Sequence, residues 1–118
     1  MTPDTQKAAL DALIEALEAG RKLTRSDFRR CFQKVATLGM LEIAADPDDW
    51  RAMAAAVALL EALLPGWSWG VGQNVWHRHF FAHVNKLEEE DVIHDFGATN
   101  DTPARALLIA TLKAWRDQ

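Results

Sequence analysis

The spacing of hydrophobic residues changes from helical to alternating near the middle of this 118-residue chain. In the first part, apolar side chains recur every three to four residues, as they do on one face of a helix. Leu10, Leu13, Ile14 and Leu17 form the first such stripe, and Gly20 is a stop signal after it. The spacing therefore predicts a helix from about residue 3 to Gly20.

Two further helices are predicted before the change of period. One begins near residues 24–26 and ends at Gly39, with an inner face of Phe28, Cys31 or Phe32, and Val35. Residues 40–45 fit a short helical extension, a turn or a brief strand. The other helix begins at Asp46-Pro47, a capping residue followed by a proline suited to the first turn, and runs to about Leu64. Its predicted stripe is Trp50, Met53, Val57, Leu60 and Leu64.

The alternating part predicts three strands, because side chains of a strand point to opposite faces in turn. The first strand carries Trp67, Trp69 and Val71 on one face and small residues on the other, which suggests that another backbone lies close to it. The second runs over residues 75–84, with Trp76, Phe80, Ala82 and Val84 on one face and His77, His79, Phe81 and His83 on the other. Residues 85–91 are predicted to be a polar connection, and residues 92–98 a third strand.

Thr102-Pro103 predicts the start of a last helix, with Leu107, Leu108, Thr111, Leu112 and Trp115 facing inward. The predicted order is ααα-βββ-α, and short connections favour an antiparallel meander. We expect an α+β fold in one domain, with the three-stranded antiparallel sheet packed by the two later helices. Residues 1–45 would form a helical N-terminal cap on an αβββα layered core of residues 46–118.

Composition narrows the class of protein. The single cysteine, Cys31, excludes an internal disulfide, and the formal net charge of −4 argues against a general nucleic-acid-binding surface. The N-terminal segment lacks the basic and apolar regions of a signal peptide, and no apolar run reaches the length of a membrane span. We therefore expect a cytoplasmic protein, with no cofactor and no membrane contact.

Three segments resemble the phage "ABA sandwich" domain, a family of small phage and prophage proteins. The first is an alanine- and leucine-rich helix that runs into Leu64-Pro65-Gly66-Trp67-Ser68-Trp69, the second an aromatic hairpin, and the third the helix start at residues 102–108. Residues 10–18 also resemble the usual N-terminal helix of these proteins. The resemblance implies a layered αβ fold and an origin in a bacterial phage, prophage or gene-transfer agent. It implies no catalytic residues, because the family has none assigned.

Histidines form the one cluster with the character of a metal site. His77 and His79 alternate on a strand, about 6.7 Å apart on one side, which is near enough for two imidazoles to share a zinc ion. His83 lies further along the same strand, and His94 on the next strand could add a ligand. Histidines on the solvent-facing side of a three-stranded sheet explain the same pattern more simply.

Nucleic-acid binding has two candidate sites. Arg25, Arg29 and Arg30 lie in a basic corner that spans residues 21–30. Phe81, among the histidines of its strand, forms a flat aromatic platform that could stack bases. The acidic net charge counts against both sites, so solvated side chains remain the simpler interpretation.

Exposed aromatic residues indicate a protein partner instead. Trp50 stands beside two aspartates at a helix start, and an exposed tryptophan among polar residues is a typical interface anchor. With Phe81, His77 and His79 it makes up the candidate protein-binding residues, whereas the other four tryptophans are predicted to lie in the core. No nucleophile or phosphate-binding loop is evident, so we expect a non-catalytic accessory protein that binds a protein partner of unknown identity. An anti-defence inhibitor such as an anti-CRISPR protein, a nucleic-acid-binding regulator and a homodimer remain alternatives.

Overall fold

The fold is α+β, with a three-stranded antiparallel sheet, as predicted. The computed structural model describes residues 3–74, 76, 79–89 and 92–118. Its elements follow in the order α1 (Pro3–Glu18), α2 (Arg25–Phe28), α3 (Val35–Ala45), α4 (Ala52–Leu63), β1 (Ser68–Asn74), β2 (His79–Glu89), β3 (Val92–Asn100) and α5 (Pro103–Arg116). The strands form a meander in the order β1-β2-β3.

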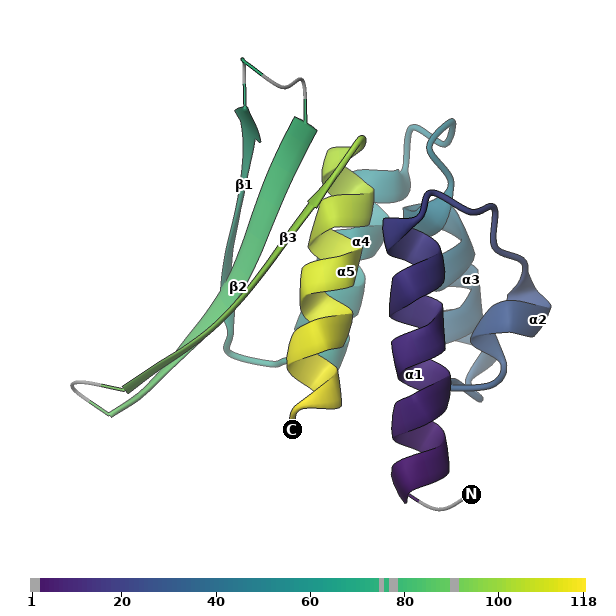
Figure 1. The fold of residues 1–118 in the computed structure, drawn as a ribbon, viewed down its shortest axis with the longest axis horizontal. Coiled ribbons are helices and arrows are strands. Elements are labelled where there is room, and N and C mark those ends of the chain that lie inside the picture. The colour runs from purple at the N-terminus through teal and green to yellow at the C-terminus, as the bar shows by residue number, and fades with distance from the viewer. Residues whose placement is uncertain (1–2, 75, 77–78, 90–91) are drawn as a thin grey trace.

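The helix α5 occupies the centre of the molecule (Figure 1). It packs against all three strands on one side and against α1, α3 and α4 on the others, and α2 packs on α3. Residues 104–112 are therefore all buried, well beyond the single inner stripe that the sequence predicts. A helix that is apolar all round is expected at such a central position. The buried hydroxyl of Thr111 donates a 2.8 Å hydrogen bond to the carbonyl of Leu107, so its polarity is satisfied.

One hydrophobic core joins the helices and the sheet. Buried residues of α1 and α3, such as Leu17 and Leu41, belong to the same cluster as Leu107 in α5 and Val84 in β2. Residues on both sides of position 46 thus share the core. Its aromatic members include Phe32, whose ring stacks on that of Trp115 with 4.9 Å between centroids.

The register of the strands assigns a side of the sheet to each residue. Trp69 pairs with Val84, and Val84 pairs with Phe96, on the side that faces α5. Gly72, Phe81 and Thr99 form a row on the other side, as do Gly70, His83 and Gly97. The predicted alternation of the second strand is therefore confirmed from His79 to Val84, with Ala82 and Val84 buried and His79, Phe81 and His83 exposed.

The predicted polar connection over residues 85–91 is wrong, because β2 continues to Glu89 and β3 begins at Val92. Strand β1 pairs with β2 only as far as Asn85, so the rest of the hairpin is two-stranded. Figure 1 shows this part extending away from the helices. Pairing between the backbone groups of β2 and β3 continues here beyond the edge of β1.

The prediction of one helix from residues 24–26 to Gly39 is also wrong. The chain turns after Phe28, and α3 begins at Val35 and continues through Gly39 to Ala45. On a straight helix of about 3.6 residues per turn, Leu41 would lie about 220° round from Phe28. The break lets both side chains reach the core, where neither is exposed, and leaves Val35 72% exposed.

The helix α4 begins later than its capping signal predicts. Asp46 ends α3, and the Asp46 carboxylate accepts a hydrogen bond from the backbone N–H of Asp48. Asp49 accepts one from the backbone N–H of Arg51 in the same way. These local turns compete with helix formation, so the first helical residue is Ala52. The buried face of α4 is Ala52, Ala55, Ala56, Leu59 and Leu60. Leu60 and Leu64 of the predicted stripe are buried, whereas Met53 and Val57 are partly buried and Trp50 is exposed.

The end of α4 lies where the sequence predicts it. Gly66 has a φ of 87°, which the β-carbon of other residues disfavours, and the chain reverses there into β1. Trp67 directly after it is buried, and its ring meets that of Phe96 at 6.1 Å.

Candidate functional site

The side of the sheet that faces away from α5 is an uncovered surface. Figure 1 shows every helix on the opposite side. Strand β2 contributes His79, Phe81 and His83 to this surface, and the ring planes of Phe81 and His83 meet at 75° with 6.5 Å between their centroids. Phe81 is 43% exposed.

Glycines of β1 make room for these rings. A β-carbon placed on Gly72 would lie 2.4 Å from Cζ of Phe81, and one on Gly70 would lie 2.8 Å from Nε2 of His83. The side chains that approach the bare face of β1 are therefore rings of the neighbouring strand. Together they produce a low aromatic surface over the glycine backbone.

His79 is anchored next to this surface. Its Nδ1 lies 3.1 Å from a carboxylate oxygen of Asp101, just before α5. A small hollow of about 170 Å³ opens beside it, lined by Asn74, His79, Phe80, Phe81 and Thr99. The hollow has space for a side chain of a partner.

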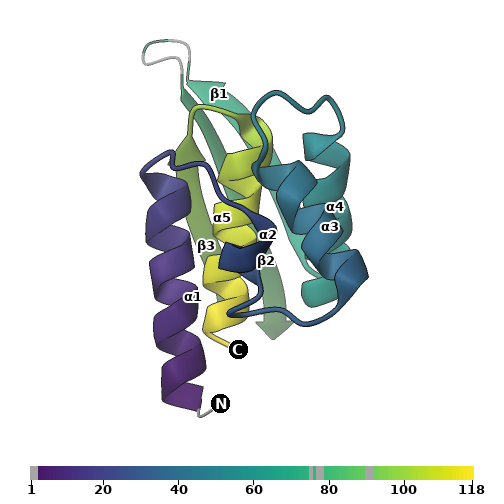
Figure 2. The same ribbon diagram turned by 90° about the vertical axis from the view of Figure 1, so that its right-hand side faces the viewer.

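Two tryptophans are almost fully exposed. Trp50 is 91% exposed in the connection between α3 and α4, as predicted, and Trp76 is 90% exposed between β1 and β2. The prediction that Trp76 is inward-facing is wrong, because β2 begins only at His79 and Trp76 precedes it in a turn. The Asn74 side chain accepts a hydrogen bond from the Trp76 backbone N–H and holds this turn. Figures 1 and 2 show the connection from α3 to α4, the end of β1 and the start of β2 at the same end of the molecule.

The predicted metal ligands do not converge. His79 and His83 share the uncovered side but are four residues apart on an extended strand, about 13 Å. His94 pairs with Lys86, on the side that faces the helices, so it points away from the other two. His77 lies outside the described residues. Among the residues that the structure describes, no three His, Cys, Asp or Glu side chains are grouped as a metal site requires.

The basic corner is partly neutralised. Arg25 forms an ion pair with Glu42 of α3, while Arg29 and Arg30 are exposed beyond the end of α2. The three arginines therefore do not act as one patch of free positive charge. This arrangement favours the interpretation of solvated side chains over a nucleic-acid site.

A hollow of about 620 Å³ lies between the connections that follow α1 and α3. The cations that line it are Arg21, Lys22, Arg25, Arg51 and Arg105, and the acids are Glu42, Asp46, Asp48 and Asp49. Asp49 forms an ion pair with Arg51 at 2.8 Å, and the hydrogen bonds from Arg51 lower the pKa of this carboxyl group. Trp50 stands at the rim, in a shallower depression that shares Asp46 and Asp49 with the hollow.

Arg105, in the first turn of α5, is the inner wall of this hollow. It is 6% exposed, and its Nη2 donates hydrogen bonds to the carbonyls of Arg21 at 3.0 Å and Ala45 at 2.9 Å. Its Nε is enclosed and has no hydrogen-bond partner among the described residues. Burial lowers the pKa of the guanidinium, and the nearby carboxylates of Asp101 and Asp46 act in the opposite direction. Sequence reasoning did not single it out as a site residue, although an arginine within the otherwise apolar run of residues 104–110 was a visible signal.

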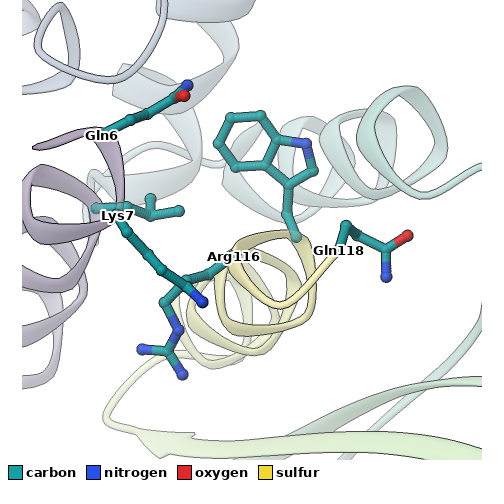
Figure 3. Close-up of a pocket in the computed structure, with 6 residues that line it drawn as sticks. Gln6, Lys7, Arg116 and Gln118 are labelled. Atoms are coloured by element: carbon teal, nitrogen blue, oxygen red, sulfur yellow. The ribbon is translucent and has the colours of Figure 1, made fainter. Parts of the chain in front are cut away.

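A further hollow, of about 350 Å³, lies between α1 and the end of α5 (Figure 3). Gln6, Lys7, Leu10, Trp115, Arg116 and Gln118 line it. Arg116 is engaged there by Asp11 at 2.9 Å and by Asp117 at 3.3 Å. The ion pair with Asp11 ties the middle of α1 to the end of α5 and gives the hollow a structural explanation.

Comparisons with known proteins do not name a family: no family model matches the chain, and neither a curated protein nor a solved structure matches it. The resemblance to the phage ABA sandwich domain therefore stays a prediction. In the described part of the chain, none of the helices combines the length and the apolar character that a membrane span requires.

Proposed function

We propose that this chain is a small non-catalytic protein that acts in the cytoplasm by binding a protein partner. The partner would contact the aromatic end, which we define as Trp50, Trp76 and Phe81. The origin that we propose is a phage, a prophage or a gene-transfer agent of a bacterial cell, on the basis of the resemblance in sequence.

The observation that carries the proposal is the exposure of two tryptophans at one end of the molecule. Trp50 and Trp76 are each about nine-tenths exposed. Trp50 lies between α3 and α4 and Trp76 between β1 and β2, and Figure 1 shows the start of α4 and the start of β2 at the same end of the molecule. Exposing so much apolar surface to water is unfavourable, and tryptophan is among the residues most enriched at interface hot spots. A partner that buries both rings would recover that free energy.

The neighbouring sheet surface supports the same proposal. Phe81 and His83 fill the space above the glycines of β1, so a partner on this side would contact aromatic rings. Polar groups surround the rings, including the paired His79 and Asp101. An aromatic centre within a polar rim is the usual anatomy of a protein interface.

An affinity purification of the tagged protein from its host, after nuclease treatment, tests this proposal. We expect one protein to be recovered in a stoichiometric amount that nuclease does not change. Recovery of nothing, or only of nuclease-sensitive material, would contradict the proposal, and the latter result would favour the basic corner at Arg25, Arg29 and Arg30. A partner that proves to be a host nuclease or its guide assembly would identify the anti-defence alternative.

A further inference from the structure

Arg105 is a buried cation with unused hydrogen-bonding capacity. Both of its side-chain hydrogen bonds come from Nη2, and the enclosed Nε lacks a partner among the described residues. An arginine keeps its charge under all ordinary conditions, and enclosing a charged donor without a partner costs free energy. Nε has no accessible surface, so a ligand in the hollow would reach the guanidinium at Nη1, which makes no hydrogen bond with a described residue.

Positive charges outnumber negative charges among the lining residues of the hollow that form no ion pair with each other. Arg25 pairs with Glu42, and Arg51 pairs with Asp49. Within the described residues, Arg21 and Lys22 form no ion pair, and they lie on the connection whose carbonyl oxygen Arg105 binds. Among the charged residues that line the space, five cations against four acids leave an excess of one positive charge, and Asp101 acts on Arg105 from outside the lining.

We propose that this hollow binds a carboxylate group, held by Arg105 at the inner wall with Arg21 and Lys22 at the entrance. Because both Nη2 hydrogens already serve carbonyl oxygens, Nη1 is left to donate a charge-assisted hydrogen bond to a carboxylate oxygen. The first turn of α5 adds the positive end of a 14-residue helix at the same place. Asp46 lies near enough to Arg105 to act on its charge, and Asp46 and Asp48 in the lining repel a second negative charge, so a singly charged group fits better than a doubly charged phosphate.

Two sources can supply this group: a free organic acid, or the carboxylate of a peptide chain. The hollow of about 620 Å³ has room for either. The inference does not rest on the protein-binding proposal, because a small acid would occupy the site in the absence of any partner.

Titration with acetate, monitored by NMR of the intact chain, tests the proposal at constant ionic strength. Acetamide, which has the same shape without the charge, is the control ligand. We expect saturable shifts of the residues around Arg105 with acetate alone. In an Arg21→Ala/Lys22→Ala variant the affinity falls by about tenfold or more, as expected when charged hydrogen-bond donors are lost.

The matched control is Arg29→Ala/Arg30→Ala, which removes the same charge from exposed positions outside the hollow. Equal weakening in both double variants would show a general charge effect and overturn the proposal, as would the absence of saturable shifts. A short peptide and its C-terminal amide then distinguish the sources. A peptide acid that binds much more tightly than both acetate and the amide identifies a chain terminus, whereas equal binding of acetate and the peptide acid identifies a free acid.

Discussion

The ring of Phe81 lies directly over Gly72 of the neighbouring strand, so closely that a β-carbon at Gly72 would be 2.4 Å from Cζ of the ring. These residues pair across β1 and β2 on the side of the sheet that no helix covers. Two features of the sequence, the small residues of β1 and the aromatic face of β2, therefore belong to one surface. This surface is part of the aromatic end through which we expect a partner to bind.

Substituting Gly72 by alanine tests whether the ring is held in this position. The added β-carbon must displace Phe81, at a cost of about 0.5–1.5 kcal/mol, which cancels the gain from removing a strand glycine. Gly97→Ala is the matched control, because its β-carbon would meet only the Ala82 carbonyl at 3.7 Å. We expect urea denaturation to show that Gly97→Ala stabilises the protein by about 0.5–1 kcal/mol and that Gly72→Ala does not. Equal stabilisation by both would contradict the close contact.

Arg105→Met tests the structural role of the buried guanidinium. The substitution leaves the carbonyls of Arg21 and Ala45 without their donor, at about 1–3 kcal/mol for each buried group, while it removes the cost of burying the charge. We expect a net loss of about 2 kcal/mol in the free energy of unfolding. Arg29→Met at an exposed site should change it by less than about 0.5 kcal/mol. Similar effects of the two substitutions would show that the bonds made by Arg105 contribute little.

The reactivity of Cys31 should report the burial of its thiol. Burial raises the pKa of the Cys31 thiol, against a smaller opposite effect of Arg30, so the reactive thiolate is scarce near neutral pH. We expect slow reaction with a thiol reagent in the native protein and fast reaction in urea. Because the pKa is higher in the folded state, this group stabilises the fold at neutral pH. Its contribution is lost as the pH rises through the raised folded-state value. Equal native and denatured rates would contradict the burial.

Two glycines should respond in opposite directions to alanine. Gly66 has a φ of 87°, where a β-carbon is strained, so we expect Gly66→Ala to lower the free energy of unfolding by about 1–2 kcal/mol. At Gly39, inside α3, the nearest atom to a new β-carbon is the Arg25 guanidinium at 3.9 Å. Gly39→Ala should raise the free energy of unfolding by about 1 kcal/mol, because alanine has the higher helix propensity. Thermal unfolding of the two variants measures both effects, and a stabilised Gly66→Ala would refute the role of the left-handed turn.

Local patterns were sufficient to predict the elements that have one covered side. The alternation of β2 predicts correctly that Ala82 and Val84 lie inside and His79 and Phe81 outside, because α5 covers one face only. The stop at Pro65-Gly66 is likewise a local property of the chain. These features depend on neighbours in sequence, which a single chain displays directly.

Long-range packing decided the features that the sequence did not predict. The helical period over residues 24–39 gives no sign of the turn after Phe28, which depends on a core built from distant helices. Phe32, beyond that turn, stacks on Trp115 at the other end of the chain. For the candidate site, the exposure of Trp50 could be predicted from its polar neighbours. The position of Arg105 in the wall of the hollow could not be predicted, because its hydrogen-bond partners Arg21 and Ala45 are 84 and 60 residues away in the sequence.

The most direct test of the proposed function compares partner recovery between variants of the chain. Trp76→Ala/Phe81→Ala removes two rings of the aromatic end, and Val35→Ala alters an exposed apolar residue at the start of α3, remote from that end (Figure 2). We expect the double variant to bind the partner from nuclease-treated host extract about thirtyfold more weakly, since a hot-spot residue contributes about 2 kcal/mol or more. Val35→Ala should bind as the native chain does. A partner held equally by all three proteins would contradict the account.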